Sequence, residues 1–527
     1  MSEGAAGKLA HLLRLAGALA GVGYVLLFVV VAFSRMSHPF ELEWMEGGSL
    51  QHLSRVAKGL PLYVLPSIDF VPYPYPPLYY QVAHALTPLA GDGFAPLRLV
   101  SILASVATMA LLFAFVRREG GRLGDGVVAA GLFAATFRAS GAYMDVARLD
   151  ALFVFLALLS AFLLRGARSR AGLLAAAGAA FLAAMTKQTE PLLLAALGLW
   201  CAVVDWERHG RVLRRWRLVP WFVLPSAAAI LAGWALLDGV LDEHFALHVI
   251  WAQSQHGVQA FRFAQFFGPD LLYTLPVPIA LSALYLALPA KDGASSRRGG
   301  DRPHLFVGLL LLGALVAALI PRVKVSGAAN NLILPYACLS LAAGLALANA
   351  EVWLGRLRAT RPRLGAAASP VLYLAVLAQL AMLLYDPRIA LPSPRDDLAG
   401  RRLVEILSRA DGEVLIPAQG YLAAMAGKPV YAHQMPVSDF AKSGLPQAAA
   451  LRESYLSAIR EQRFALIIDS TNSFLRRYPD AAVLERYYRR AGWALEDYDT
   501  LKPISGFGVQ PGVVWVPRKD GEFEDSR

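Results

Sequence analysis

Three carboxylates that could act as a catalytic base lie close together near the N-terminal end of the chain. Glu41, Glu43 and Glu46 fall within six positions, after an apolar run that ends near Phe33. A carboxylate beside a substrate hydroxyl can take its proton, which is the task of a general base. We place Glu46 first for this role and Glu43 second. Alternatively, the three are solvated loop charges or the acidic first turn of a surface helix.

Four cations could bind a phosphate group. Arg148 and Lys187 lie beside apolar runs, and Arg322 and Lys324 follow another one. Charged side chains at membrane depth are costly unless they face a cavity or a partner. Fixed cations hold phosphate through charge-assisted hydrogen bonds. The pattern therefore predicts an anion site formed by these four residues.

Asp145 is the third candidate catalytic residue. It stands three positions before Arg148 in the segment RASGAYMDVARLD. If both residues belong to one helix, they share a face at the membrane boundary. The alternative is a plain intrahelical ion pair between them.

A run of prolines and tyrosines, VPYPYPPLYY, precedes the second apolar run. Proline fixes the backbone, and tyrosine suits the interface between membrane and water. We predict that Tyr73, Tyr75 and Tyr79, with Gln188, form a substrate-binding loop. The alternative is an aromatic belt, although a belt alone does not need a rigid Pro-Tyr run.

The elements that must position these residues are membrane helices. The chain is 56% hydrophobic and 17% charged, with a mean hydropathy of +0.46, and such a composition does not form a soluble globule of ordinary surface. We predict an α-helical polytopic membrane protein with about eleven transmembrane helices, each run being long enough to cross the hydrocarbon layer. The runs are 15–34, 96–116, 124–143, 149–165, 171–187, 189–205, 218–238, 268–289, 304–321, 331–350 and 367–385.

The distribution of Lys and Arg predicts the orientation. Connections such as RREGGRL, ERHGRVLRRWR and KDGASSRRGGDR are rich in cations, whereas the alternate connections are longer and poorer in them. By the positive-inside rule, the N-terminus is cytoplasmic and the tail is extracytoplasmic. The net charge of +11 is thus mainly an orientation signal, and we expect no nucleic-acid partner. Both cysteines, Cys201 and Cys338, fall in predicted spans, which leaves no disulfide framework or thiolate metal site.

Two domains are predicted. Residues 1–385 form the membrane domain, whose first external loop, 35–95, includes an amphipathic helix from about 48 to 58 with Leu50, Leu53 and Val56 on one side. Residues 386–527 form a small extracytoplasmic α/β domain. Its predicted strands are GEVLIPA, KPVYAH, FALIIDS and GVVWVP, and its predicted helices are GYLAAMAG and AAALRESYLSAIREQR.

Taken together, these motifs resemble the GT-C membrane glycosyltransferases, which include the protein O-mannosyltransferases and the aminoarabinose transferases of lipid A. The resemblance covers most of residues 10–350. It rests on EWMEGGSLQHLSRVAKGLPLY, YPYPPLYY, ARLDALFVFLALL, MTKQTEPLLL and VSGAANNLILPYACLSLAAG in this order and spacing.

The resemblance implies a hexosyl- or pentosyltransferase of the plasma (bacterial inner) membrane that inverts the anomeric centre. Its partners would be a polyprenyl-phosphate sugar donor, membrane lipid, and an extracytoplasmic lipid, glycan or protein acceptor. Many family members carry an Asp-Glu pair in the first loop, but here Met45 stands directly before Glu46. The family pattern therefore carries onto Glu46, and Glu43 is the stand-in for the missing Asp.

A divalent metal, Mg²⁺ or Mn²⁺, is the cofactor that such a loop could hold. Its ligands would be Glu46 and Asp145, because a divalent ion needs more than one carboxylate oxygen. His244, His248 and His256 of a later external loop are candidate additional ligands or, alternatively, interfacial polar residues.

Two other classes of protein remain as alternatives. A transporter or lipid flippase also needs a polar cavity among many helices, but it predicts charges near the middle of spans and internal repeats. A non-catalytic scaffold would leave the acidic loop and the external cations without a role.

Overall fold

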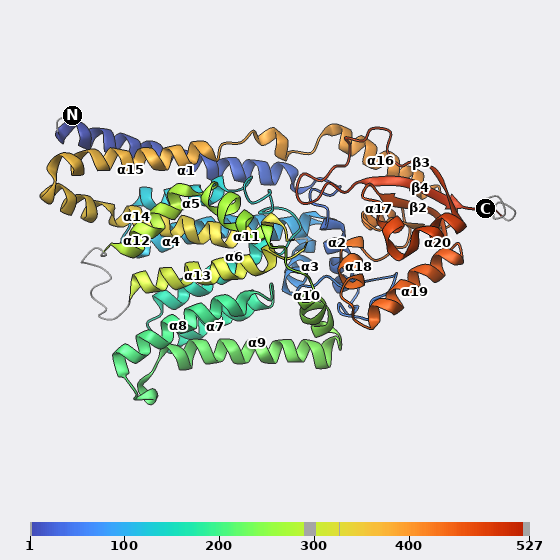
Figure 1. Ribbon diagram of the computed structural model, residues 1–527, viewed down its shortest axis with the longest axis horizontal. Coiled ribbons are helices and arrows are strands. Elements are labelled where there is room, and N and C mark those ends of the chain that lie inside the picture. The colour runs from blue at the N-terminus through green and yellow to red at the C-terminus, as the bar shows by residue number, and fades with distance from the viewer. Residues whose placement is uncertain (1–2, 289–301, 326, 520–527) are drawn as a thin grey trace.

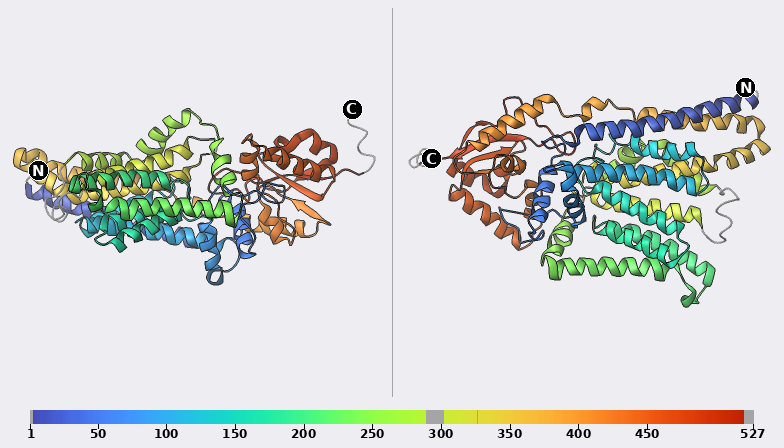
Figure 2. Two further views of the ribbon diagram at one scale, coloured as in Figure 1. Left: turned by 90° about the horizontal axis from the view of Figure 1, so that it is seen from below. Right: turned by 180° about the vertical axis from the view of Figure 1, so that it is seen from behind.

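The computed structural model describes residues 3–288, 302–325 and 327–519. Long helices form a bundle along the longest axis of the molecule (Figure 1). Residues 386–519, called the C-terminal segment, pack against one end of this bundle. The N-terminus lies at the opposite end of the bundle, as two further views also show (Figure 2). The predicted cytoplasmic connection KDGASSRRGGDR lies outside the described residues, apart from its last residue.

A helix stands at each of the eleven positions that the apolar runs predict. These helices are α1 (Glu3–Met36), α4 (Ala95–Arg118), α5 (Leu123–Ala135), α6 (Asp150–Gly166), α7 (Arg170–Ala184), α8 (Glu190–His209), α9 (Leu224–Leu236), α12 (Pro276–Ala287), α13 (Pro303–Arg322), α14 (Ile333–Thr360) and α15 (Pro362–Met382). Short π-helical turns extend α9 at both ends and precede α12.

Among the described residues, six helical segments are long and apolar enough to cross a membrane. The number is seven if the helical segments Phe261–Leu272 and Pro276–Ala287, which are bent by 87° relative to each other, count as one span. The chain is therefore a multi-pass membrane protein, as its composition predicts. Four other predicted spans are not among these seven. α5, α6 and α7 have 13, 17 and 15 residues, which is short for a full crossing, and α8 has 20 residues but does not meet the same criteria. The total of eleven crossings stays a prediction.

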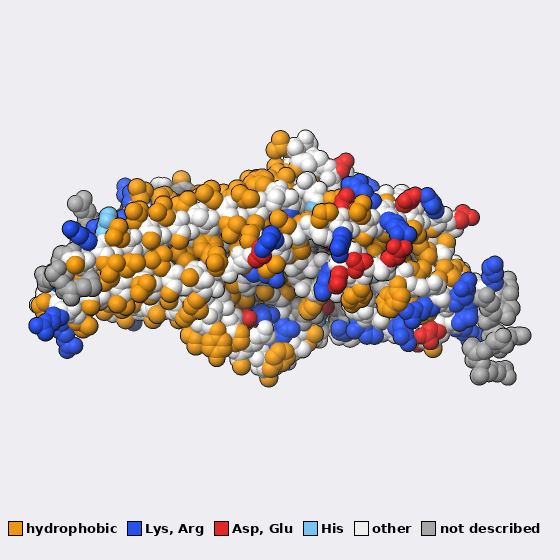
Figure 3. All heavy atoms as spheres, turned by 90° about the horizontal axis from the view of Figure 1, so that it is seen from above, with side chains coloured by type: hydrophobic (Ala, Val, Ile, Leu, Met, Phe, Trp, Pro, Cys, Tyr) orange, Lys and Arg blue, Asp and Glu red, His pale blue; other side chains and the backbone are white. Residues whose placement is uncertain are grey.

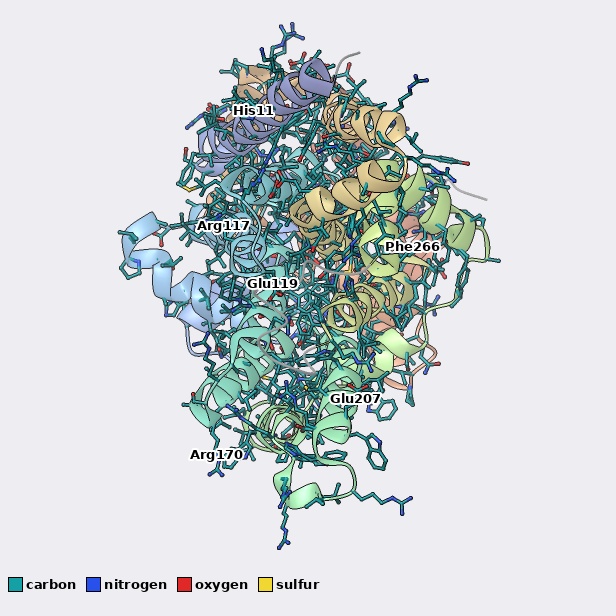
Figure 4. All side chains as sticks on the ribbon, turned by 90° about the vertical axis from the view of Figure 1, so that its left-hand side faces the viewer. His11, Arg117, Glu119, Arg170, Glu207 and Phe266 are labelled. Atoms are coloured by element: carbon teal, nitrogen blue, oxygen red, sulfur yellow. The ribbon has the colours of Figure 1, made fainter. Side chains whose placement is uncertain are left out.

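The surface of the bundle is apolar because it faces lipid. Leu12, Leu19 and Val30 of α1 are more than 60% exposed, and orange side chains cover this part of Figure 3. By contrast, α14 is the central helix, with 94% of its apolar window buried. Charged side chains gather over the C-terminal segment and at the opposite tip, where Figure 4 shows Arg117, Glu119 and Arg170.

Two short helices build the first loop. α2 (Glu46–Ala57) confirms the predicted amphipathic helix, since Leu53 is buried and its neighbours Leu50 and Val56 pack against the same core. α3 (Leu78–Ala90) is not predicted from the sequence, because its short apolar pattern directly follows a proline-rich stretch that favours a loop. Both helices lie between the bundle and the C-terminal segment (Figure 1).

The segment 136–149 differs from the predicted helix. α5 ends at Ala135, and the chain then runs through turns and bends until α6 begins at Asp150. Gly141 and Ala142 have positive φ angles, +75° and +56°, which a helix does not allow. Asp145 and Arg148 therefore do not share a helix face.

The C-terminal segment contains a four-stranded sheet in the order β1-β2-β4-β3. β1 (Glu413–Leu415) runs parallel to β2 (Phe464–Ser470), and β4 (Pro511–Pro517) runs antiparallel to β2 and to β3 (Tyr488–Trp493). Helices α16 (Pro394–Ser408), α17 (Gly420–Met425), α18 (Gln434–Ala441), α19 (Gln447–Arg460) and α20 (Ala481–Tyr487) accompany it.

Two strand assignments differ from the sequence prediction. The predicted strand KPVYAH is not part of the sheet, since Ala432 within it donates its N–H to the carbonyl of Ile68 in the first loop instead. β3 is missed because its sequence, YRRAGW, is mostly exposed at the edge of the sheet and lacks the apolar alternation of a half-buried strand.

Candidate active site

Glu46 is fully buried and paired with Arg98. Its Oε1 accepts hydrogen bonds from Arg98 Nε at 2.9 Å and the Ala147 N–H at 2.6 Å. Its Oε2 accepts from Arg98 Nη2 at 2.6 Å and the Leu42 N–H at 2.7 Å. Burial alone would raise the pKa of Glu46, but Arg98 and the two N–H groups hold it below its ordinary value. These four hydrogen bonds leave the carboxylate no free lone pair for a substrate.

Arg98 explains why Glu46 is held there. Besides the carboxylate, its guanidinium donates to the carbonyls of His38 and Phe40 at 2.6 and 2.7 Å. The pair thus ties the start of the first loop to the first turn of α4. The sequence contains a signal for this contact, namely one arginine inside an apolar run, but it does not name the partner.

Glu43 is also buried, yet it is held more loosely. Its Oε2 accepts the Met45 N–H at 3.0 Å and lies 3.7 Å from Arg148 Nη1. Its Oε1 is 3.4 Å from the hydroxyl of Tyr143. Burial raises the pKa of Glu43 to about 7, and Arg148 opposes that rise. Glu43 can therefore exchange a proton near neutral pH.

Asp145 forms a second buried ion pair, with Arg35. Arg35 Nε donates to one carboxylate oxygen at 2.7 Å and Nη2 to the other at 2.5 Å, and both side chains are at most 1% exposed. Arg35 also donates to the carbonyls of Ala142 and Ala390. The alternative of an intrahelical pair with Arg148 is wrong, because Asp145 is turned toward α1 instead.

A cavity of about 130 Å³ lies beside residues 41–46, the acidic part of the first loop, which we call the acidic loop. Three of the four predicted cations line it, namely Arg148, Lys187 and Lys324, and so do Tyr75 and Gln188 of the predicted substrate loop. The walls come from the first loop, the turn between α7 and α8, the segments around 253–256 and 324–331, and the C-terminal segment. The sequence also missed Tyr143, which lines the cavity next to Glu43.

Asp150 organises the cations on one side of this cavity. Lys187 Nζ donates to Asp150 Oδ1 at 2.7 Å and to Asn331 Oδ1 at 3.0 Å. Asn330 Nδ2 lies 3.0 Å from both Asp150 oxygens, and Arg148 Nε is 3.8 Å away. The sequence prediction did not include Asp150 or the two asparagines, although the segments ARLD and GAANN that contain them stand out among apolar runs.

Arg148 lies at the centre of the site. Its Nη2 donates to the Tyr75 hydroxyl at 3.0 Å, and Nη1 contacts the sulfur of Met45. Nε is buried and has no hydrogen-bond partner among the described residues. Arg148 therefore stands between Glu43 and Asp150 and still has capacity for an anion.

Arg322 and Lys324 differ in their surroundings. Arg322 forms a two-point ion pair with Asp270 at 2.7 and 3.1 Å and does not line the cavity. Lys324 Nζ donates to the carbonyl of Gln253 at 2.8 Å and does line it. Arg322 therefore lies apart from the other three predicted phosphate-binding cations, Arg148, Lys187 and Lys324.

The remaining tyrosines of the predicted substrate loop, Tyr73 and Tyr79, lie outside this cavity. The Tyr73 hydroxyl donates to the Met45 carbonyl, and the Tyr79 hydroxyl donates to the Leu97 carbonyl. Both side chains are at most 1% exposed, and neither lines the cavity. A Cβ atom on Gly48 would meet the Tyr73 hydroxyl at 1.9 Å, so the close packing of this loop requires glycine there.

The candidate metal ligands do not fit a metal ion. Glu46 and Asp145 are each occupied by an arginine. The His248 ring contacts the Val64 carbonyl, whereas His256 faces the cavity. Within residues 3–288, 302–325 and 327–519, no three His, Cys, Asp or Glu side chains group as a metal would require.

Comparison with known structures identifies the fold. A structure of ArnT from Cupriavidus metallidurans bound to undecaprenyl phosphate matches with a TM-score of 0.58 and 16% identity, covering 95% of this chain and 98% of that chain. The chain has the GT-C glycosyltransferase fold. The predicted resemblance is therefore confirmed at the level of the fold.

Two further GT-C structures match over most of this chain. The oligosaccharyltransferase of Archaeoglobus fulgidus, tethered to an acceptor peptide, has a TM-score of 0.50 and 11% identity and covers 93% of this chain and 74% of that chain. The mycobacterial arabinofuranosyltransferase AftD has a TM-score of 0.51 and 19% identity and covers 96% of this chain and 40% of that chain.

Sequence comparison gives a narrower match. Residues 74–241, about a third of the chain, match the model of the dolichyl-phosphate-mannose-protein mannosyltransferase family. This part of the GT-C fold runs from the proline-tyrosine run through α9. No protein with a curated description matches the sequence.

Proposed function

We propose that the protein is a membrane glycosyltransferase that moves a sugar from a polyprenyl-phosphate carrier to an extracytoplasmic lipid, glycan or protein acceptor. The observation that carries the proposal is the cavity beside the acidic first loop, at the end of an apolar bundle, with Arg148, Lys187 and Lys324 in its walls. The GT-C fold and the ArnT structure bound to undecaprenyl phosphate support this choice of donor.

Arg148, Lys187 and Lys324, the cations that line the cavity, would bind the phosphate of the donor. Arg148 and Lys187 are held in place by Asp150, and Lys187 by Asn331 as well, so they need little reorganisation when an anion enters. The leaving group of the reaction is the carrier phosphate, which gains negative charge as the bond to the anomeric carbon breaks. Fixed cations stabilise that charge most in a site that excludes water.

Glu43 would be the general base, in preference to Glu46. Its pKa of about 7 suits the exchange of a proton at neutral pH, whereas Glu46 is committed to Arg98. Glu43 does not line the cavity, but the Tyr143 hydroxyl at 3.4 Å links its carboxylate to the cavity wall. We assign Glu46 and Asp145 positioning roles through their arginine partners.

The proposed reaction is a single displacement. The acceptor hydroxyl loses its proton toward Tyr143 and Glu43 while its oxygen forms a bond to the anomeric carbon of the sugar. The bond from that carbon to the phosphate oxygen breaks, and the polyprenyl phosphate leaves. Such a displacement inverts the anomeric centre, as the resemblance to GT-C enzymes implies.

We also propose the orientation and the domain division. The membrane domain would be 1–385, and the C-terminal domain, 386–527, would be extracytoplasmic in a plasma (bacterial inner) membrane. The first loop and the C-terminal segment lie at the same end of the bundle, while the N-terminus and Arg170 lie at the other (Figures 1 and 4). Arg117 and Arg170, which belong to two predicted cytoplasmic connections, lie at that second end (Figure 4).

The position of the cavity favours an enzyme over a transporter. A transporter binds its substrate near the middle of the membrane between two repeats. Here the cavity residues lie at helix ends and in loops, next to the C-terminal segment.

The test is binding and turnover of defined lipids by purified protein. Undecaprenyl phosphate and a panel of undecaprenyl-phosphate sugars are offered, and hydrolysis or transfer is followed by mass spectrometry. Lys324→Ala should weaken binding of undecaprenyl phosphate about 10-fold or more, because it removes one charge-assisted hydrogen bond from the site. The control, Lys58→Ala, removes an exposed cation of the same end outside the cavity.

Arg148→Met and Lys187→Met should reduce binding at least as much. Size-exclusion chromatography checks that each variant stays monodisperse. The proposal is wrong if the wild type binds and converts none of these lipids, or if Lys324→Ala, Arg148→Met and Lys187→Met all bind undecaprenyl phosphate as well as the wild type does.

A further inference from the structure

One wall of the cavity is supplied by the C-terminal segment. Helix α18 contributes Met435 and Asp439, and a later loop contributes Phe507. Phe507 packs edge-on against Trp44 of the acidic loop, with ring centroids 5.4 Å apart. The Ser505 N–H donates to the Leu42 carbonyl at 2.9 Å. The segment is therefore a fixed part of the site.

Asp439 is the carboxylate that faces this cavity most directly. Its side chain is 17% exposed, and His256 Nε2 lies 3.9 Å from its Oδ1. Among the described residues, no hydrogen bond to this carboxylate is formed, and His256 is the cation that approaches it. Burial raises the pKa of Asp439 to about 7, and Lys442 opposes that rise. The carboxylate thus keeps free lone pairs inside a polar cavity.

The position of Asp439 does not serve the stability of its own helix. α18 has eight residues, Gln434–Ala441, and Asp439 stands in its last turn. A negative charge at this end of a helix is unfavourable, because the free carbonyl groups there are also negative. An acid at such a place, whose nearest cationic contact is His256 at 3.9 Å, fits a role toward a ligand better than a role in folding.

Arg148 and Lys187 line the same cavity as Asp439 and have the opposite charge. Tyr75 lines this cavity too, and its hydroxyl accepts a hydrogen bond from Arg148. A phosphate bound at Arg148 and Lys187 would be repelled by a carboxylate across the cavity. A hydroxyl group would be attracted, because a carboxylate accepts hydrogen bonds.

We infer that Asp439, backed by His256, binds hydroxyl groups of a sugar in this cavity, so that the C-terminal segment takes part in choosing the substrate. The inference rests on the proposed function, since the sugar would reach Asp439 because its phosphate is bound at Arg148 and Lys187. The hydroxyl groups belong either to the sugar of the donor or to the acceptor, and both would be recognised by the same chemistry.

The experiment compares Asp439→Asn with the wild type and with Asp411→Asn. Asp411 is an exposed acid of the same segment, away from the cavity. Affinities are measured for undecaprenyl phosphate and for each undecaprenyl-phosphate sugar that the wild type converts. Transfer in a detergent extract of membranes that contain the natural acceptor is measured beside hydrolysis of the same donor.

If the donor sugar is the ligand, Asp439→Asn weakens binding of the glycosylated lipid about 10- to 100-fold and leaves binding of undecaprenyl phosphate unchanged. If the acceptor is the ligand, both affinities stay unchanged, and transfer falls about 10-fold or more relative to hydrolysis. His256→Gln should shift the same quantity in the same direction by a smaller factor. Asp411→Asn should change none of these quantities.

The inference is overturned if Asp439→Asn leaves both the preference for glycosylated lipid and the ratio of transfer to hydrolysis as in the wild type. That result would not touch the proposed function, because the wild type would still bind and convert its donor. A wild type that binds none of the lipids contradicts the proposed function and this inference together.

Discussion

Replacement of Glu46 by glutamine tests whether this residue positions the first loop or performs the chemistry. The carboxylate accepts four hydrogen bonds, two from Arg98 and two from the backbone N–H groups of Leu42 and Ala147. A glutamine has one oxygen and one amide nitrogen in their place. Whichever way it turns, its NH₂ group faces one nitrogen of Arg98 and one backbone N–H, and donor meets donor.

The expected loss of stability is large. Glutamine leaves the guanidinium of Arg98 buried without a counter-charge, and Arg98 is 0% exposed. Breaking a buried ion pair by removing one partner costs about 3–5 kcal/mol of unfolding free energy. We therefore expect Glu46→Gln to lower the midpoint of thermal unfolding in detergent by several degrees and to reduce the yield of monodisperse protein.

The assay is tryptophan fluorescence during heating, with two comparison variants. Glu43→Gln should keep a midpoint near that of the wild type, because it removes a carboxylate whose charged form is already disfavoured by burial. The double variant Arg98→Met/Glu46→Gln should recover part of the loss, since replacing both members of a buried pair is milder than removing one.

Activity separates the two glutamates further. Glu43→Gln should reduce transfer about 10²- to 10⁴-fold, the usual contribution of a general base, while donor binding survives. Folded Glu46→Gln protein should lose less. The reasoning is refuted if Glu46→Gln is as stable as the wild type and inactive, while Glu43→Gln transfers sugar at the normal rate.

Three other predictions concern pH, charge geometry and orientation. Burial raises the pKa of Glu43 to about 7, so this base is mostly protonated at pH 6 and mostly ionised at pH 8. Single-turnover transfer should therefore rise roughly tenfold over that interval. A flat pH profile would exclude Glu43 as the base. Arg148→Lys keeps the charge but loses the fork that reaches Tyr75 and Glu43; undecaprenyl phosphate should still bind while transfer falls, and normal transfer would contradict this. In sealed right-side-out vesicles, a membrane-impermeant maleimide should modify a cysteine placed at exposed Asp411 and spare a cysteine placed at exposed Arg168. Both native cysteines are buried. The reverse labelling pattern would show that the orientation is inverted.

The bundle could be predicted from the sequence because membrane helices are specified locally. A run of apolar residues of sufficient length is itself the requirement for a span, and a helix stands at every predicted run. The amphipathic helix α2 could also be predicted locally, because Leu50, Leu53 and Val56 recur at helical spacing. The two differences within the sheet arose where burial, rather than local pattern, decides which segment is a strand.

The choice between the two glutamates could not be predicted from the sequence. Arg98 is 52 positions from Glu46, and Arg35 is 110 positions from Asp145. In the sequence, Arg35 follows one apolar run and Arg98 lies inside another, and only the fold shows which acid each arginine pairs with. The same holds for Asp439, which is separated from the first loop by most of the chain and meets the cavity only because α18 packs there.

The charges of the site account for the division of labour between these pairs. Glu46 and Asp145 are each paired with one arginine, so they fix the backbone around the cavity and add no net charge to it. Arg148 is different, because it stands 3.7 Å from Glu43 and also lines the cavity. In the proposed reaction, one proton moves to Glu43 as one negative charge appears on the leaving phosphate. The charge thus passes from one side of Arg148 to the other, and the guanidinium can stabilise it at both places without moving. A site built in this way needs a base that is close to the phosphate-binding cation but outside the phosphate pocket, which is the position of Glu43 and not that of Glu46.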